Sequence, residues 1–154
     1  MAYWLMKSEP SAFSIDDLQA RQEALWDGVR NYQARNFMRT MQVGDQAFFY
    51  HSSCPEPGIV GIMEIVRAAY ADPTQFDPEN HHYDPKSSPE KPRWDGVDVG
   101  FRSKLPAVLP LSELRALPGL DGLALLRQGN RLSVMPVTEE QWSIIRRRMG
   151  LINR

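Results

Sequence analysis

The chain has 154 residues, of which 42% are hydrophobic and 24% charged, and its formal net charge is −1. This length predicts a single domain, residues 1–154, and the composition excludes a disordered chain. The longest apolar runs are too short to cross a bilayer, so no membrane partner is expected. A net charge near zero gives no general attraction to phosphates, although arginines gather locally in residues 21–39 and 146–154.

Helices are predicted where capping patterns precede apolar periodicity. Ser14 and Asp17 form a capping-box pattern that opens a short helix to about Gln22. A polar helix follows near residues 33–41, and two short helices are expected at residues 111–117 and 120–127. A second capping box, residues 138–141, begins the last helix, whose inward stripe is Trp142, Ile145 and Met149.

Strands are predicted where short aromatic and β-branched runs lie between turn signals. The expected strands are residues 3–7, 46–51, 59–70, 94–101, 106–110 and 131–135. Short strands of this kind favour a β-barrel or a twisted sheet over a helical bundle. Residues 72–93 contain five prolines and no periodicity, and a loop of this length inside a domain is typically functional or disordered. We expect it to be ordered, because aromatic residues at 76, 83 and 94 are available to anchor it.

Cysteine and histidine are too scarce for a structural metal site. Cys54 is the one cysteine, and the chain has three histidines, whereas structural zinc requires four nitrogen or sulfur ligands. A single cysteine cannot form an internal disulfide, which is typical of proteins in a reducing cytosol. We therefore expect a cytoplasmic monomer that carries neither a metal nor another cofactor.

No familiar catalytic arrangement is visible in the sequence. His51 precedes Ser52 directly, but neighbouring residues on a strand point to opposite faces, so this histidine cannot simply activate that hydroxyl. There is no Gly-x-Ser-x-Gly elbow, phosphate-binding loop or dinucleotide fingerprint. The sequence therefore predicts a protein that is not an enzyme.

Aromatic residues beside polar turns suggest a different chemistry. Trp4, Trp26 and Tyr50 lie close in sequence to hydroxyl, amide and cationic side chains. A nucleobase site needs such a mixture, because rings stack on the base while donors and acceptors bind its edge. The alternative for each tryptophan is the hydrophobic core, where aromatic residues are common.

Several of these blocks resemble the EVE-domain family. The resemblance is carried by residues 4–10 (WLMKSEP), 26–36 (WDGVRNYQARN), 50–61 (YHSSCPEPGIVG) and 131–137 (RLSVMPV), and it extends over essentially the whole chain. It implies an α+β, PUA-like fold, a curved β-barrel with short peripheral helices. It also implies a pocket for a flipped modified base, of the 5-methylcytosine or 5-hydroxymethylcytosine type, in DNA or RNA.

The resemblance and the chemistry together predict the site residues. In this hypothesis Trp26 stacks on the base, and Asn31 with Ser8 or Ser52 binds its Watson–Crick edge. The full predicted pocket is Trp4, Lys7, Ser8, Trp26, Arg30, Asn31, Tyr50, His51, Ser52, Arg131 and Ser133. The predicted phosphate contacts are Lys7, Arg30, Arg35 and Arg131.

Two other function classes stay open at this point. Related barrels include enzymes acting on RNA or nucleotides, for which Glu9, Asp27 and His51 would be the acid and base candidates. A protein-interaction module holding a small polar ligand is the third possibility. Turnover of a nucleic acid would favour the enzyme, and binding indifferent to nucleic acid would favour the interaction module.

Overall fold

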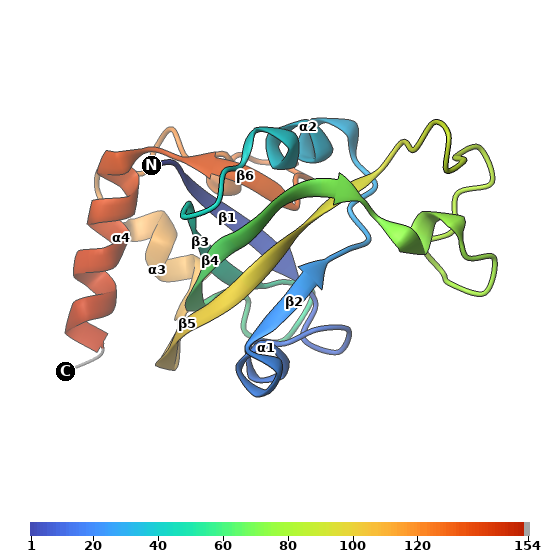
Figure 1. The fold of residues 1–154 in the computed structure, drawn as a ribbon. Helices are drawn as coiled ribbons and strands as arrows, with labels where there is room; N and C mark the ends of the chain where they lie inside the picture. The colour runs from blue at the N-terminus through green and yellow to red at the C-terminus, as the bar shows by residue number, and fades with distance from the viewer. Residues whose placement is uncertain (153–154) are drawn as a thin grey trace.

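The protein is built around one mixed sheet of six strands (Figure 1). The structure, a computed structural model, describes residues 1–152, and the side chains of residues 1–150. The strands are β1 (Tyr3–Ser8), β2 (Glu23–Trp26), β3 (Gln46–His51), β4 (Gly58–Ala71), β5 (Asp95–Pro110) and β6 (Val134–Val137). The helices are α1 (Ile15–Arg21), α2 (Tyr32–Thr40), α3 (Leu111–Ala116) and α4 (Glu139–Ile152), with 3-10 turns at Pro73–Phe76 and Ala124–Leu126.

The strand order is β2-β5-β4-β3-β1-β6, in which β1 and β3 are parallel and the other pairs antiparallel. Among the described residues, β2 and β6 are edge strands that do not pair with each other. The α+β class is therefore confirmed, but the predicted curved β-barrel is not, because the sheet stays open. Register shifts along the long β4–β5 pair bend the sheet strongly without closing it.

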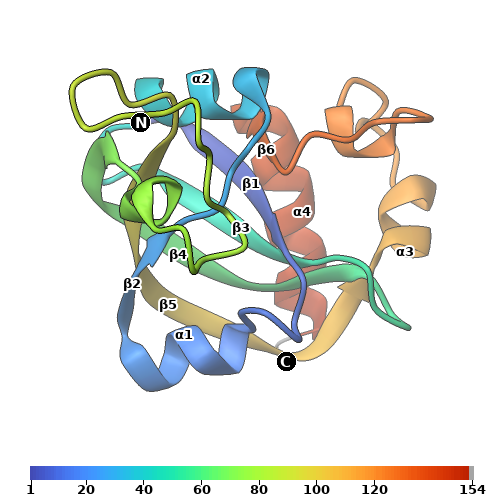
Figure 2. The same cartoon turned by 90° about the vertical axis from the view of Figure 1, so that its right-hand side faces the viewer.

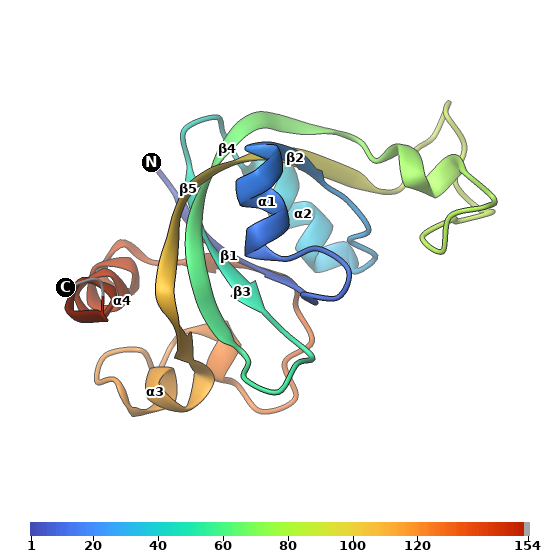
Figure 3. The same cartoon turned by 90° about the horizontal axis from the view of Figure 1, so that it is seen from below.

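Helices cover both faces of this sheet (Figure 3). Alternation along β1 sends Trp4 and Met6 to the face covered by α1 and α2, and Leu5 to the face covered by α3 and α4. Phe49 and Phe48 on β3 divide between the two faces in the same way. Each face thus has its own hydrophobic cluster, and Trp4, Leu5 and Met6 fix the middle of β1 between the two clusters.

Most of the predicted elements are present with shifted boundaries. Both capping boxes form: Ser14 with Asp17, and Thr138 with Gln141. The predicted strands 94–101 and 106–110 are one strand, β5, because β4 pairs with both parts of it across several register shifts. The predicted helix 120–127 is only the short turn Ala124–Leu126, and β2 was not predicted from the sequence.

The proline-rich segment 72–93 is an ordered loop that projects from the ends of β4 and β5 and faces the viewer in Figure 2. Gln75 anchors it from inside, because its buried amide binds the backbone of Asp72, Arg93 and Trp94. Within the described residues, no helix has the length and apolar character that crossing a membrane requires.

Candidate functional site

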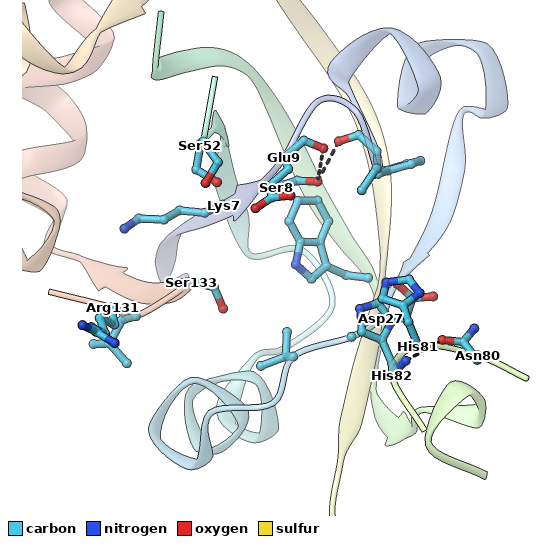
Figure 4. A pocket seen from close by; sticks show the side chains of 17 residues that line it. Lys7, Ser8, Glu9, Asp27, Ser52, Asn80, His81, His82, Arg131 and Ser133 are labelled. Atoms are coloured by element: carbon cyan, nitrogen blue, oxygen red, sulfur yellow. Dashed lines mark hydrogen bonds between the residues drawn. The ribbon is translucent and has the colours of Figure 1, made fainter. Parts of the chain in front are cut away.

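The main cavity opens where β1 ends, between the β2–α2 connection and the 72–93 loop (Figure 4). Its volume is about 750 Å³, within the usual range for small-molecule sites. Three groups of residues line it: Lys7, Ser8, Glu9, Ala12 and Phe13; Trp26, Asp27, Gly28 and Val29; and Ser52, Ser53, Asn80, His81, His82, Arg131, Leu132 and Ser133.

Backbone hydrogen bonds bring the first wall together. The Lys7 amide donates to the Ser133 carbonyl at 2.8 Å, and the Ser52 amide donates to the Ser8 carbonyl at 3.0 Å. These bonds tie the end of β1 to the segments before β6 and after β3. As a result, hydroxyl groups that are far apart in the sequence face the same cavity.

Trp26 lies at the end of β2 and is 5% exposed. Phe49 and Phe13 meet its indole edge to face, with ring centroids 5.2 and 6.2 Å away. The Nε1 of Trp26 forms no hydrogen bond within the described residues, while the cavity lies beside the ring. Trp26 is therefore both a core residue and a cavity wall, and a bound ligand can use its unpaired N–H donor.

A buried carboxylate organises the opposite wall. Asp72 is fully buried and accepts hydrogen bonds from the Gly28 amide at 2.8 Å and from the Thr74 amide and hydroxyl at 2.9 and 2.7 Å. Arg30 forms an ion pair with it at 3.0 Å. Burial opposes ionisation, but these donors outweigh it and lower the pKa of Asp72.

Arg30 extends this network to the loop. Its guanidinium donates five hydrogen bonds, to the Asp72 carboxylate, the Val29 and His82 carbonyls and the Thr74 hydroxyl. Two of them are donated to the His82 carbonyl, at 3.0 and 2.8 Å, and so fix the position of the loop residues that line the cavity. All five guanidinium N–H groups are used, which leaves none for the phosphate contact predicted from the sequence.

The cavity carries charged groups of both signs. Lys7 and Arg131 form no ion pair within the described residues, and burial lowers the pKa of the Lys7 amine. Glu9 and Asp27 are exposed carboxylates on the same lining. Burial, reinforced by the neighbouring His81, lowers the pKa of His82.

Six of the predicted pocket residues do line this cavity. They are Lys7, Ser8, Trp26, Ser52, Arg131 and Ser133. Their part in binding a base stays a prediction, but the structure brings them together around one space.

The other predicted pocket residues lie outside the lining. Trp4 is a core residue whose Nε1 donates to the buried Asp45, and Tyr50 is 3% exposed on the opposite face of the sheet. Asn31 caps α2, because its side-chain oxygen accepts from the Ala34 amide at 2.9 Å. These three assignments are corrected, because Trp4 and Tyr50 are buried outside the cavity lining and the Asn31 oxygen caps a helix.

His51 and Arg35 are also placed elsewhere. His51 Nε2 accepts the Ile15 amide at the start of α1, and burial lowers the pKa of this imidazole. Arg35 donates to the Arg93 carbonyl at 2.9 Å, outside the cavity. The sequence arguments missed the wall formed by Asn80, His81 and His82; the one available signal was the unusual length of their loop.

A family model described as "EVE domain" matches residues 2–148. The chain therefore belongs to the EVE-domain family, as the resemblance suggested. It is 49% identical to thymocyte nuclear protein 1 of Mus musculus over 162 residues, which cover 93% of this chain and 71% of that protein. Thymocyte nuclear protein 1 of Danio rerio is 50% identical, covering 92% of this chain and 69% of that protein.

Solved structures with the same fold include a protein from Pseudomonas syringae, 57% identical, with a TM-score of 0.95 over 96% of this chain and 99% of that one. The human THYN1 protein in complex with 5-methylcytosine-containing DNA is 44% identical, with a TM-score of 0.89 over 100% of this chain and 99% of that one. An ASCH protein from Zymomonas mobilis, 8% identical with a TM-score of 0.53, shares the fold alone.

These comparisons correct the expected localisation. The sequence argument placed the chain in the cytoplasm because of its single cysteine. Relatives that are 46–50% identical are named thymocyte nuclear protein 1, and that name places them in the nucleus. A single cysteine is equally compatible with any reducing compartment, so it cannot distinguish the two.

Proposed function

We propose that residues 1–154 form a single, monomeric domain that binds modified bases in DNA or RNA without catalysing a reaction. The observation that carries this proposal is the cavity beside Trp26, on a fold shared with a human protein bound to 5-methylcytosine-containing DNA. The modified bases that it would accept are 5-methylcytosine and 5-hydroxymethylcytosine.

The lining suits a base that has left its stack. A flipped base is recognised by apolar contact with its ring and by hydrogen bonds to its edge. Trp26 and Phe13 supply the apolar contact, while Ser8, Ser133 and the free Nε1 of Trp26 supply polar groups. The whole cavity, of about 750 Å³, has room for a cytosine ring together with a methyl or hydroxymethyl group.

The two unpaired cations of the lining suit the phosphates on either side of such a base. Lys7 and Arg131 are both on the β1–β6 side of the cavity (Figure 4). Arg30 is not a phosphate contact in this proposal, because its guanidinium N–H groups all bind protein acceptors. Arg35 lies outside the cavity, so it does not contact the phosphates of the base held there. Exposed carboxylates beside the cations keep non-specific attraction to nucleic acid weak.

A lack of catalysis is supported by the state of the candidate base. The Nε2 lone pair of His51 is occupied by the Ile15 amide, and the ring lies outside the cavity lining. Glu9 and Asp27 are exposed, rather than held in the buried setting that typically tunes a catalytic carboxyl group. An RNA- or nucleotide-acting enzyme remains the alternative, and incubation with nucleic acid followed by product analysis tests it.

The decisive experiment fills the cavity. Ser133 lines it, and its side chain forms no hydrogen bond within the described residues, so Ser133→Phe blocks the space without removing a bond. We expect the wild type to prefer a methylated or hydroxymethylated oligonucleotide over an unmodified one in fluorescence anisotropy at a stated salt concentration. S133F should abolish that preference.

The matched control is Ser143→Phe, on the exposed surface of α4. It should bind like the wild type, and both variants should keep the wild-type melting temperature within a few degrees. Equal binding of modified and unmodified strands by the wild type would refute the proposed function, as would an unchanged preference in S133F.

A further inference from the structure

Outside the cavity, an exposed tyrosine lies flat on a buried tryptophan. Tyr32, the first residue of α2, is 51% exposed, whereas Trp94 beneath it is 6% exposed. Their ring centroids are 4.7 Å apart and the planes differ by 26°. Trp94 is itself fixed, because its Nε1 donates to the Asp84 carboxylate at 2.8 Å. The tyrosine ring is therefore held in one orientation before any ligand arrives.

Half of the Tyr32 surface is open to solvent, at 51% exposure. The Cζ atom of Arg35 lies 4.7 Å from the Tyr32 centroid and 5.9 Å from the Trp94 centroid. A guanidinium on the outer face would be much farther from Trp94, so Arg35 lies on the inner side or at the edge. Among the described side chains, no other ring or cation contacts Tyr32 by its face. A planar group from solvent can therefore stack there.

Cations at the rim of this ring lack acidic partners. Arg93 Nη1 approaches the Tyr32 hydroxyl at 3.5 Å, and Arg35 is bound to the Arg93 carbonyl. Neither arginine forms an ion pair within the described residues, whereas Arg39, one turn further along α2, is paired with Asp95. Sites that stack on nucleic acid combine an exposed aromatic ring, which contacts a base, with cations that attract the phosphates. Tyr32 with Arg35 and Arg93 has this combination.

This surface adjoins the cavity. Val29 lines the cavity and Tyr32 follows three residues later, so their Cα atoms are at most about 11 Å apart. Arg30 contacts both the Tyr32–Trp94 stack and the cavity wall. Its Cζ lies 5.5 Å from the Trp94 centroid, and its N–H groups donate hydrogen bonds to the His82 carbonyl. The short segment from Val29 to Tyr32 therefore keeps the exposed ring close to the cavity.

We propose that Tyr32, backed by Trp94, stacks on a base adjoining the flipped one in a single-stranded segment, while Arg35 and Arg93 bind its phosphates. This inference rests on the proposed function, since the cavity sets the register of the strand. It assigns to Tyr32 affinity that does not depend on the modification, because every nucleobase offers an aromatic face.

The test measures single-stranded oligonucleotides containing one 5-methylcytosine or one cytosine, by fluorescence anisotropy, against Tyr32→Ala and Tyr32→Phe. We expect Y32A to lose about 5-fold or more in affinity for both strands, with the methylated-to-unmethylated ratio unchanged. Y32F keeps the ring and should stay within about twofold of the wild type. Tyr83→Ala, at a 40% exposed tyrosine without an aromatic or cation contact among the described residues, is the matched control.

Abasic oligonucleotides identify the stacked nucleotide. Removing the base on one side of the 5-methylcytosine should cost the wild type as much as Y32A does, and should cost Y32A nothing further. Arg35→Gln and Arg93→Gln should each reduce the slope of log affinity against log salt by about 0.7.

The outcomes separate this inference from the proposed function. Unchanged affinity in Y32A, or a changed methylation ratio, overturns the stacking role and leaves the cavity proposal intact. A wild type without preference for the methylated strand overturns the cavity proposal, and the stacking proposal fails with it. Melting temperatures of all variants show whether a loss of affinity in Y32A comes from unfolding. If it does, the affinities of Y32F and of the abasic strands decide whether Tyr32 stacks on a base.

Discussion

Replacing Asp72 with asparagine tests whether one buried carboxylate holds the cavity together. The substitution keeps the shape of the side chain but removes its charge. It also places an NH₂ group among the Gly28 amide, the Arg30 guanidinium and the Thr74 donors. At least one of those donors then loses its acceptor, and the Arg30 charge is left without its counterion.

The expected cost follows from burial. Asp72 has no exposed side-chain surface and Arg30 has 22%. Breaking a buried ion pair by changing one partner costs about 3–5 kcal/mol. For a chain of 154 residues, each kcal/mol lowers the melting temperature by about 2–4 °C, so D72N should melt about 6–20 °C below the wild type.

Urea unfolding of D72N and of Asp77→Asn provides the assay. Asp77 lies in the same loop but is exposed, and among the described residues its carboxylate accepts only the Glu79 amide. D77N should lose about 1 kcal/mol or less, with the same dependence on urea as the wild type. D72N should also bind the methylated oligonucleotide more weakly, since Gly28 and His82 lose their support.

Low pH provides an independent check on the same carboxylate. The folded-state pKa of Asp72 is below its ordinary value of 3.8. Its stabilisation is therefore fully present above pH 3.8 and is lost as the pH falls through the folded-state pKa. The gap in unfolding free energy between wild type and D72N should narrow in that range. A cost below about 1 kcal/mol at pH 7, or a gap independent of pH, would refute the reasoning.

Three further variants probe the walls of the cavity. Trp26→Ala should lower the free energy of unfolding by about 3–5 kcal/mol, because Phe49 and Phe13 pack on this buried indole; a drop under 1 kcal/mol in urea unfolding would show that Trp26 is not a core residue. Gly28→Ala should weaken both stability and binding, since Gly28 has φ +78° and an added Cβ would overlap the His82 ring; unaltered melting and anisotropy curves would argue against this contact. The pKa of His82 is lowered from 6.5, so its imidazole is neutral at pH 7 and gains a positive charge only at lower pH. Oligonucleotide affinity should therefore rise as the pH falls below 6.5. A His81→Asn/His82→Asn double variant should show a flatter pH profile of affinity, and a profile identical to that of the wild type would show that these histidines do not cause the rise.

Local patterns in the sequence were sufficient for the elements that depend on neighbouring residues. The capping boxes at Ser14 and Thr138 predicted the starts of α1 and α4, because both partners lie within one helical turn. A short aromatic run between turn signals predicted β3, and family blocks spread over the whole chain predicted an EVE domain.

Long-range contacts decided the rest. The sequence indicated aromatic and polar residues in the right segments, but not that Trp4 would bind Asp45 and Arg30 would bind Asp72, pairs separated by about forty positions. An indole or a guanidinium is available to a ligand only if no distant residue of the folded chain already forms a hydrogen bond with it. The same reason explains the wall at residues 80–82. A proline-rich loop has no periodicity of its own, and its position is set by the buried groups of Gln75 and Asp72, which only the tertiary structure brings into place.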